Sequence, residues 1–323
     1  MRAVQVRSHG GPEVLEPAEL DDPTPGAGNL LVRVAAAGVN YIDTYHRTGA
    51  YPLPLPFVPG LEGAGRVVAV GEGVEGFVPG DRVAWAHAPG SYAELAVVPA
   101  HQAIHVPDEL DDHTAAAIPL QGMTAHYLTA STYPVQPGDV ALVHAAAGGM
   151  GLLLTQMIKA RGGRVIGTVS TAEKEKLARE AGADEIIRYT EVDDLAGEVR
   201  RLTGGEGVPV VYDGVGAATF EASLASLRPR GMLVLFGAAS GPVPPFDLQR
   251  LNAAGSLFVT RPTLAHHIAT REELDWRAGE VFGAVIRGEL TIRVTGRYPL
   301  ERAADAHTDL QSRRTTGKLL LVP

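Results

Sequence analysis

Short apolar segments separated by glycine- and proline-rich turns make up the first hundred residues of the chain. The predicted strands among them include LLVRVAAAGV, GRVVAVGEGV and DRVAWAHAPGSYAELAVV, and the turn-like stretches include DDPTPGAG and YPLPLPFVPG. The dipeptides Pro59-Gly60 and Pro79-Gly80 are further turn signals, and the second leads into a strand at Asp81. This pattern predicts a twisted antiparallel, barrel-like domain rather than repeated βαβ units.

Beyond residue 122 the apolar segments become almost continuous and alternate with helices. The predicted strands are DVALVHA, GRVIGTV, DEIIRY, PVVYDGVG, GMLVLFG and GSLFVTR, and residues 150–161 and 172–181 are two of the helices between them. Continuous apolar strands that alternate with helices predict a parallel sheet that is buried on both faces. Their number, about six, is that of a doubly wound dinucleotide-binding domain.

After residue 261 the pattern changes to amphipathic helices, over residues 270–287 and 300–311, and a final strand, GKLLLVP. These elements do not continue the βαβ series, so we expect them to pack on the first domain. The whole chain has 323 residues, which is enough for two domains.

Composition and charge narrow the classes of function. Hydrophobic residues make up 45% of the chain and charged residues 20%, as in a soluble globular protein. A formal charge of −9 and a pI of about 5.7 offer no basic surface to nucleic acid or to an anionic membrane. The N-terminal segment lacks the apolar core of a signal peptide, and no stretch approaches the roughly 18 apolar residues that span a bilayer. We therefore expect a soluble, cytoplasmic protein.

Cysteine is absent, which excludes disulfides, thiolate nucleophiles and cysteine-ligated zinc or iron–sulfur sites. His101 and His105 have i, i+4 spacing, but prolines and β-forming residues surround them. The adjacent His266 and His267 have side chains that point apart. Because no metal-binding helix motif and no G-x-S-x-G motif is present, the sequence predicts neither a functional metal nor a serine nucleophile.

A glycine-rich turn follows the strand over residues 140–144 and opens a helix, which is the context that a dinucleotide fingerprint requires. Ala146 takes the first fingerprint position, Gly148 the second and Gly151 the third. The helix N-terminus offers free N–H groups and a partial positive charge to phosphates. The predicted pyrophosphate-binding residues are Ala147, Gly148, Gly149, Met150 and Gly151. The alternative is a tight β–α turn that binds no ligand.

The residue expected to bind the ribose of the cofactor is unusual. Ser170 lies nineteen residues after Gly151, where an NAD site would place a carboxylate. Lys174 follows one helical turn later, and Tyr189 ends the next strand. A hydroxyl and an ammonium would hold the 2′-phosphate that a carboxylate would repel, so the turn is predicted to bind NADPH. The alternative is that Ser170 caps the next helix and Lys174 is a solvated surface charge.

The segment GDVALVHAAAGGMGLLLTQMIK, which includes Gln156 and Lys159, resembles the signature of the quinone oxidoreductase (zeta-crystallin) branch of the medium-chain dehydrogenase/reductase superfamily. The segments GVNYIDTYHRTGAYP, PGLEGAGRVVAVG, GDRVAW, YDGVG, LFGAASG and VTRPTL are similar to family segments and follow the family order. The resemblance implies an α/β protein with a GroES-like, antiparallel barrel-type catalytic domain over residues 1–122 and 262–323. It implies a Rossmann-fold NADPH-binding domain over residues 123–261.

The resemblance also implies a homodimer, joined by the segment GSLFVTR, and the loss of the zinc sites found in alcohol dehydrogenases. Those enzymes carry thiolate ligands, which this chain cannot supply, and a ligand histidine where this chain has Leu61.

The resemblance places the catalytic residues in the first domain. Asn40 and Tyr45 would lie near the nicotinamide or the substrate, with Asp43 as an orienting carboxylate. Tyr51 matches the position at which related enoyl reductases carry a proton-donating tyrosine. For each of these tyrosines the alternative role is packing.

The resemblance implies further cofactor contacts. Gln121 and Thr124 would lie at the domain junction, with Thr124 near the cofactor, and the backbone of Phe236 and Gly237 would hold the carboxamide. The candidate phosphate or substrate contacts are Arg261 and Arg313, for which a surface salt bridge is the alternative.

The absence of zinc fits the expected chemistry. An alkoxide has the basicity of hydroxide, with a conjugate-acid pKa of about 15.7, and zinc stabilises that charge. Reduction of a quinone leaves an oxyanion whose proton affinity is near the tyrosine value of roughly 10, because the charge is delocalised. The sequence therefore predicts an NADPH-dependent quinone reductase that transfers either single electrons or hydride. The alternatives are an NADPH-dependent reductase of α,β-unsaturated carbonyls that uses Tyr51 as an acid and, less in keeping with the charge, an RNA-binding or crystallin-like structural protein.

Overall fold

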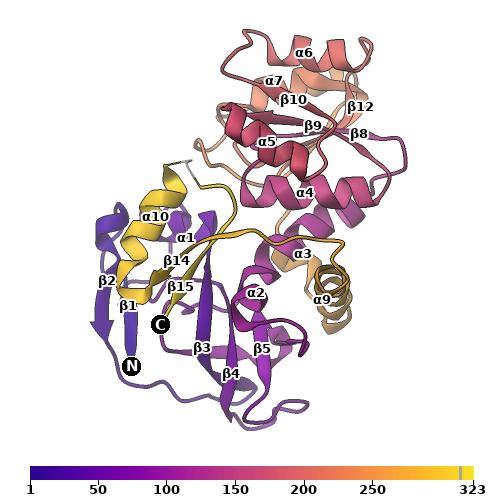
Figure 1. The fold of residues 1–323 in the computed structure, drawn as a ribbon. Coiled ribbons are helices and arrows are strands. Elements are labelled where there is room, and N and C mark those ends of the chain that lie inside the picture. The colour runs from indigo at the N-terminus through magenta and orange to yellow at the C-terminus, as the bar shows by residue number, and fades with distance from the viewer. Residues whose placement is uncertain (313–314) are drawn as a thin grey trace. The chain divides into compact units, whose positions relative to one another are not determined.

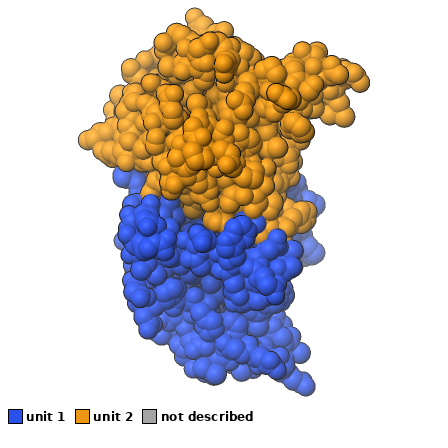
Figure 2. Space-filling model, turned by 90° about the vertical axis from the view of Figure 1, so that its right-hand side faces the viewer, with its two compact units in different colours: residues 1–123, 268–323 blue, residues 124–267 orange. Residues whose placement is uncertain are grey.

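The computed structural model describes residues 1–312 and 315–323. The chain divides into two compact units (Figure 2): Met1–Met123 with Ile268–Pro323, and Thr124–His267. The second unit is an insertion in the first along the sequence. Residues 262–267, which the sequence pattern placed with the catalytic domain, belong to the second unit.

The first unit is built on a mostly antiparallel sheet, which in the described residues has seven strands in the order β14-β15-β3-β4-β5-β7, with β6 also paired to β3. Among the described strands of this sheet, only β14 and β15 run parallel to each other. The strand bounds are β3 Asn29–Val39, β4 Glu62–Val70, β5 Arg82–Trp85, β6 Leu95–Pro99, β7 Ile104–His105, β14 Val294–Pro299 and β15 Lys318–Val322. A separate antiparallel pair consists of β1 (Arg2–Gln5) and β2 (Glu16–Glu19).

Strand β3 organises this sheet because three strands pair with it. Its first half alternates, and Leu30, Val32 and Val34 are buried, whereas its last residues are buried on both sides. The C-terminal strand β15 pairs with the end of β3, where Leu319 lies opposite Val39. The apolar core beneath the sheet includes Leu30, Val32, Val83, Trp85, Tyr92, Val98, Leu319 and Leu321.

The helices of the first unit lie around this sheet, as Figure 1 shows. Their bounds are α1 Tyr41–Thr48, α2 Asp112–Ala117, α3 Pro119–Tyr127, α9 Arg271–Ile286 and α10 Ala303–Gln311, with 3-10 turns η1 Pro12–Val14, η2 Ala100–Gln102 and η5 Leu300–Arg302. Helix α2 contacts β3 and β4, α10 contacts β14 and β15, and α9 contacts β7. The chain passes from the first unit to the second within α3.

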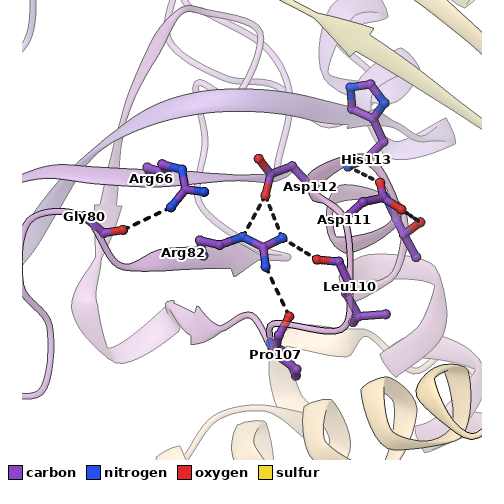
Figure 3. A network of polar contacts seen from close by, with 9 residues as sticks. Arg66, Gly80, Arg82, Pro107, Leu110, Asp111, Asp112 and His113 are labelled. Carbon is purple, nitrogen blue, oxygen red and sulfur yellow. Dashed lines mark hydrogen bonds and ion pairs between the residues drawn. The ribbon is translucent and has the colours of Figure 1, made fainter.

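A polar network ties β5 to the start of α2 (Figure 3). The guanidinium of Arg82 donates to the carboxylate of Asp112 through Nε at 2.9 Å and Nη2 at 2.7 Å. It also donates to the backbone carbonyls of Pro107, at 3.2 Å, and of Leu110. Asp111 caps α2 by accepting hydrogen bonds from two backbone N–H groups of the first turn. One arginine therefore fixes the loop that delivers the chain to α2 and α3.

The second unit is a parallel sheet of six strands in its described residues, in the order β10-β9-β8-β11-β12-β13. In sequence order this is 3-2-1-4-5-6, the doubly wound arrangement of a Rossmann domain. The central strands are the most deeply buried, and every residue of β11 is buried, whereas the edge strand β13 is largely exposed. The α/β fold predicted from the apolar pattern is thus confirmed. The strand bounds are β8 Val140–Val143, β9 Arg164–Val169, β10 Glu185–Arg188, β11 Val208–Asp213, β12 Leu227–Leu235 and β13 Phe258–Thr260.

Helices pack against both faces of this parallel sheet. Helices α4 and α5 contact each other and strands β8 to β10, whereas α6 contacts α7, which packs on β11 and β12. Right-handed crossovers place these two pairs on opposite faces. The bounds are α4 Gly149–Ala160, α5 Ala172–Glu180, α6 Leu195–Leu202, α7 Phe220–Ser226 and α8 Gln249–Ala253, with a π-helical turn η3 at Leu128–Thr132 and a 3-10 turn η4 at Leu264–His267. Across the described ranges, none of the helices combines the length and the apolar character that crossing a bilayer would require.

Candidate functional site

The glycine-rich turn connects β8 to α4 and has the geometry of a phosphate-binding turn. Helix α4 begins at Gly149, and its N-cap is Gly148, which has no side chain to occupy the first N–H groups. Those N–H groups, from Gly149, Met150 and Gly151, have no acceptor within a helix. They are therefore free to bind an anion. Ala147, by contrast, is buried in the turn.

Two glycines of the turn have different roles. A Cβ atom on Gly151 would lie 2.3 Å from the carbonyl oxygen of Ala145 and 2.6 Å from the Cα of Ala146, so only glycine permits this approach of helix and strand. A Cβ atom on Gly148 would meet only the Ala145 oxygen, at 3.2 Å. The space beside Gly148 is therefore available to a ligand.

The turn itself is made by Ala145 rather than by the first fingerprint position, Ala146. Ala145 has a left-handed backbone with φ of 50°, and its carbonyl accepts a hydrogen bond from Gly148 N at 2.8 Å. A left-handed alanine is uncommon, because the Cβ atom disfavours this conformation.

The carboxyl ends of β9 and β10 bring two of the predicted ribose-binding residues together. Ser170 directly follows β9, and Tyr189 directly follows β10. Tyr189 N donates to Val169 O at 3.1 Å, and Thr190 Oγ1 donates to Ser170 O at 3.1 Å. Ser170 is half-buried and the Tyr189 side chain is 46% exposed. The two residues thus border one edge of the sheet.

The interpretation that Ser170 caps helix α5 is wrong. The N-cap is Thr171, whose Oγ1 accepts a hydrogen bond from Lys174 N at 3.3 Å. Lys174 lies in the first turn of α5 and is half-buried. The Ser170 hydroxyl is therefore not needed for the helix start.

The carboxyl ends of β12 and β13 lie at the same edge of the parallel sheet as those of β8, β9 and β10. Phe236 N and Gly237 N both donate to Asp213 O, at 2.9 and 3.4 Å, so these N–H groups bind the neighbouring strand. Arg261 follows β13, and its Nη1 donates to the backbone carbonyl of Leu235 at 3.0 Å. Arg313 lies outside the described residues.

Asn40, in the first unit, lies at the N-cap of α1 and is 2% exposed. Its Nδ2 donates to Glu62 Oε2 at 2.8 Å, and its Oδ1 accepts hydrogen bonds from Lys318 Nζ at 2.7 Å and from Gln121 Nε2 at 3.3 Å. Its backbone N–H donates to Asp43 Oδ2 at 2.8 Å. The structure therefore brings three predicted site residues together, Asn40, Asp43 and Gln121.

Two hydrogen-bond partners of Asn40, Glu62 and Lys318, were not predicted from the sequence. Glu62 and Lys318 form an ion pair in which both side chains are almost completely buried. Glu62 also accepts a hydrogen bond from Leu120 N at 2.7 Å. The available signal was an acidic residue at the start of EGAGRVVAV and a basic residue at the start of KLLLV, two strand segments whose other residues are apolar except for the exposed Arg66. Buried charges of opposite sign pair with each other.

A second buried network of hydrogen-bonded side chains extends from Asp43. Tyr92 OH lies 3.0 Å from Asp43 Oδ2 and 3.0 Å from His307 Nε2, and His307 Nδ1 lies 3.1 Å from Arg47 Nη1. Burial raises the pKa of Asp43 to about 7, against the hydrogen bonds from Asn40 and Tyr92. Burial and the Arg47 charge lower the pKa of His307 to about 3. His307 is thus neutral at pH 7, and Arg47 donates to its Nδ1.

The two predicted site tyrosines are neighbours. The rings of Tyr45 and Tyr51 are 5.2 Å apart in an edge-to-face arrangement, and Tyr51 N donates to Tyr45 O at 3.1 Å. Tyr51 is 43% exposed. His46, whose ring is 6.4 Å from that of Tyr51, was not anticipated; burial, with a smaller effect of nearby His87, lowers its pKa.

Thr124 follows Gln121 by three residues on α3, at the start of the second unit, and is half-buried. A zinc ion does not fit the residues present. The chain has no cysteine, and no group of three or more histidine, aspartate or glutamate residues in the described ranges could hold a metal.

Comparisons with known proteins agree with this architecture. Residues 26–108 match the family described as alcohol dehydrogenase GroES-like domain, and residues 149–277 match the family described as zinc-binding dehydrogenase. The chain is 48% identical to a quinone oxidoreductase of Pseudomonas aeruginosa, over all of this chain and 99% of that protein. It is 43% identical to a 2-haloacrylate reductase of a Burkholderia species, over 99% of this chain and 98% of that protein. The solved structure of a mycobacterial protein in complex with NADPH is 55% identical, with a TM-score of 0.98 over the full length of both chains.

A GroES-like domain combined with a Rossmann domain that carries a glycine turn defines a medium-chain dehydrogenase/reductase. Within this superfamily the chain belongs to the quinone oxidoreductase family. The resemblance inferred from the sequence is thereby confirmed.

Proposed function

We propose that this chain is an NADPH-dependent quinone reductase that works without a metal. NADPH as the cofactor is supported by the residues at one edge of the parallel sheet. Ser170 stands there in place of the carboxylate of an NAD site, and the N-terminus of α4 has no side-chain cap. The quinone is supported by the full-length similarity to a quinone oxidoreductase. The similar mycobacterial protein binds NADPH.

The proposed cofactor site uses the residues that border this edge. Gly148, Gly149, Met150 and Gly151 would hold the pyrophosphate through backbone N–H groups. Ser170, Lys174 and Tyr189 would surround the 2′-phosphate, and Thr124, Phe236, Gly237, Arg261 and Arg313 would be further contacts. When bound, NADPH supplies the reducing equivalents.

The proposed catalytic residues are in the first unit. Tyr45 and Tyr51 would face the acceptor, since Tyr51 is partly exposed and packs edge-to-face on Tyr45. Asn40 and Asp43 would order the start of α1, and Gln121 would be held by Asn40. We keep the predicted bounds for the proposed catalytic domain, residues 1–122 and 262–323, and for the NADPH-binding domain, residues 123–261; the compact units of the structure change a few residues away, after Met123 and after His267.

The cofactor assignment is tested by titrating NADPH and NADH into the native protein and into Lys174→Ala. A charge-assisted hydrogen bond contributes about 1.5–3 kcal/mol, so the preference for NADPH is expected to shrink by about tenfold or more. The matched control is Lys176→Ala, which removes the same charge from a side chain that is 79% exposed and pairs with Glu180 at 3.9 Å. Equal effects of the two substitutions would contradict a specific contact at Lys174.

A second candidate function has support in the similarity to a 2-haloacrylate reductase. In this alternative the chain reduces the double bond of a conjugated carbonyl, and Tyr51 supplies the proton. NADPH oxidation is measured with a series of quinones and with a series of alkenals and 2-haloacrylates. Turnover of the conjugated carbonyls with no response to quinones would overturn the quinone assignment. A Tyr51→Phe variant that keeps full alkenal turnover would exclude Tyr51 as the acid.

We also infer a homodimer joined through β13. This strand is at the edge of the parallel sheet, and two of its residues, Phe258 and Val259, are 56% and 38% exposed. An exposed apolar edge strand favours pairing with another chain, and two-fold symmetry would join the two sheets. Light scattering of native protein and Val259→Lys tests this; a native monomer would contradict it. A cytoplasmic location and the absence of nucleic-acid binding stay predictions.

A further inference from the structure

Four polar side chains form a buried chain beneath the glycine turn, within the unit of Thr124–His267. Ser223 Oγ lies 2.8 Å from Asp213 Oδ2 and 2.9 Å from His144 Nε2, and His144 Nδ1 lies 3.1 Å from Thr168 Oγ1. All four side chains are at most 3% exposed. Neither the cofactor contacts nor the catalytic residues proposed above include any of them.

The direction of each hydrogen bond follows from chemistry. Asp213 accepts from the N–H groups of Val215 and Gly216 and from the hydroxyl of Thr219, so it acts as a carboxylate. A carboxylate cannot donate, and the hydroxyl of Ser223 must therefore donate to it. The Nε2 atom of His144 then donates to Ser223.

His144 is neutral, because burial lowers its pKa, although the charge of Asp213 opposes this shift. Its Nδ1 atom is therefore an acceptor and receives the hydroxyl hydrogen of Thr168. Thr168 Oγ1 in turn has lone pairs left to accept a hydrogen bond from the turn. The chain of donors thus has one direction, from Thr168 to Asp213.

The far end of this chain holds the glycine turn at two points. Thr168 Oγ1 accepts from Ala145 N at 3.3 Å, and Thr168 O accepts from Ala146 N at 3.0 Å. Ala145 is the left-handed residue of the turn, and its carbonyl binds Gly148 N. A strained conformation persists only where its surroundings determine it. The position of Gly148 therefore depends on the hydroxyl of Thr168.

We propose that Thr168 and His144 are positioning residues for the pyrophosphate-binding turn: they orient Ala145 so that the N–H groups at the start of α4 face the cofactor. The proposal rests on NADPH binding as proposed above and goes beyond it, because these residues touch the turn and not the cofactor. The pyrophosphate is common to NADPH and NADH. Loss of the positioning must therefore weaken both cofactors by the same factor.

The test is the isosteric substitution Thr168→Val, with calorimetric titrations of NADPH and NADH. We expect both dissociation constants to rise by about tenfold, with their ratio unchanged, because a buried N–H and a buried imidazole nitrogen lose their partners. Thr168→Ser keeps the hydroxyl and is expected to restore both constants to within about threefold. Lys174→Ala is expected to change the ratio instead.

The control is Thr155→Val. Thr155 is a buried threonine of the same unit whose hydroxyl has no hydrogen-bond partner among the described residues. This substitution is expected to leave both dissociation constants unchanged. A Thr168→Val protein with a lower melting temperature but native constants would overturn the proposal, since Thr168 would then serve only stability. Weaker binding of NADPH alone would also overturn it. If the native protein bound neither cofactor, the proposed function itself would fail.

Discussion

The ammonium group of Lys318 donates a hydrogen bond to the side-chain oxygen of Asn40 over 2.7 Å, although 278 positions separate the two residues in the chain. Lys318 also forms an ion pair with Glu62, and the two charged side chains are 2% and 0% exposed. This contact joins the C-terminal strand β15 to the N-cap of α1. A residue of the C-terminal strand thus helps to hold the side chain of a proposed site residue.

Lys318→Met is expected to lower the free energy of unfolding by about 3–5 kcal/mol, because it leaves the carboxylate of Glu62 buried without its partner. The double variant Glu62→Gln, Lys318→Met removes both charges and is expected to cost less than the sum of the single substitutions. Urea unfolding of the native protein, Glu62→Gln, Lys318→Met and the double variant gives the coupling energy between the two residues directly.

A surface pair provides the comparison. Arg287 and Glu289 form an ion pair at 2.8 Å in which both side chains are more than half exposed. Arg287→Met is therefore expected to cost less than about 1 kcal/mol. A Lys318→Met protein as stable as the native one would show that Glu62 does not need its charge compensated.

Asp43→Asn is expected to change how stability depends on pH. The pKa of Asp43 is raised by burial to about 7 in the folded protein, whereas an aspartate in the unfolded chain titrates at about 3.9. Between these values the folded state binds more protons. The stability that the Asp43 carboxyl contributes is thus fully present below about pH 4 and is lost as the pH rises through about 7.

Relative to Asp43→Asn, the native protein should lose up to about 1.4 kcal/mol per pH unit over that window. Urea unfolding of both proteins at pH values from roughly 4.5 to 8, which span most of this titration, measures the difference. His307→Gln provides a check of opposite sign. The pKa of the native His307 is lowered by burial to about 3, from about 6.5 in the unfolded chain. The stability that His307 contributes is therefore present above about pH 6.5 and is lost as the pH falls. Differences of the same sign for the two variants would contradict this assignment.

The elements that depend on local pattern were predictable from the sequence. Alternation in β3 and continuous burial in β11 correspond to apolar spacing, which local sequence carries directly. The glycine turn was found for the same reason, because its spacing relative to β8 and α4 is local. Its left-handed residue was not found, since an alanine such as Ala145 gives no propensity signal for this conformation.

The contacts between distant segments could not be predicted. Glu62 and Lys318 belong to strands that pair with opposite sides of β3, and only the sheet order brings them together. Ser170 was considered as a cap of the helix that follows it and Thr171 was not, and local sequence does not separate the two because serine and threonine have similar cap preferences. The backbone decides between them, and it places Thr171 at the N-cap.

Ser170→Ala and Thr171→Ala are expected to separate cofactor selectivity from helix stability. Loss of the Thr171 hydroxyl removes the cap of α5 and should lower the free energy of unfolding by about 1 kcal/mol. Loss of the Ser170 hydroxyl should leave stability within about 0.5 kcal/mol and reduce the preference for NADPH over NADH. Thermal unfolding and cofactor titration are measured on both variants. A stability loss at Ser170 equal to that at Thr171 would contradict the assigned cap.

Gly148→Ala and Gly151→Ala are expected to differ in stability although both lose NADPH. At Gly151 the new Cβ atom would lie 2.3 Å from a backbone oxygen, so helix and strand must move apart and several kcal/mol of stability should be lost. At Gly148 the nearest atom is 3.2 Å away and φ is −78°, so the fold accepts alanine at the cost of about 1 kcal/mol for a poorer N-cap. The methyl group would nevertheless occupy the space proposed for the pyrophosphate.

Gly279→Ala completes this comparison, because a Cβ atom there meets nothing within 4 Å and Gly279 lies inside helix α9. Alanine at this position should stabilise the protein by about 0.5–1 kcal/mol and leave NADPH binding unchanged. The informative protein is Gly148→Ala: near-native unfolding with an NADPH dissociation constant raised at least about a hundredfold is expected, since the methyl group excludes the phosphates from the N–H groups of α4. Native NADPH affinity in this variant would show that the cofactor does not approach the backbone at Gly148.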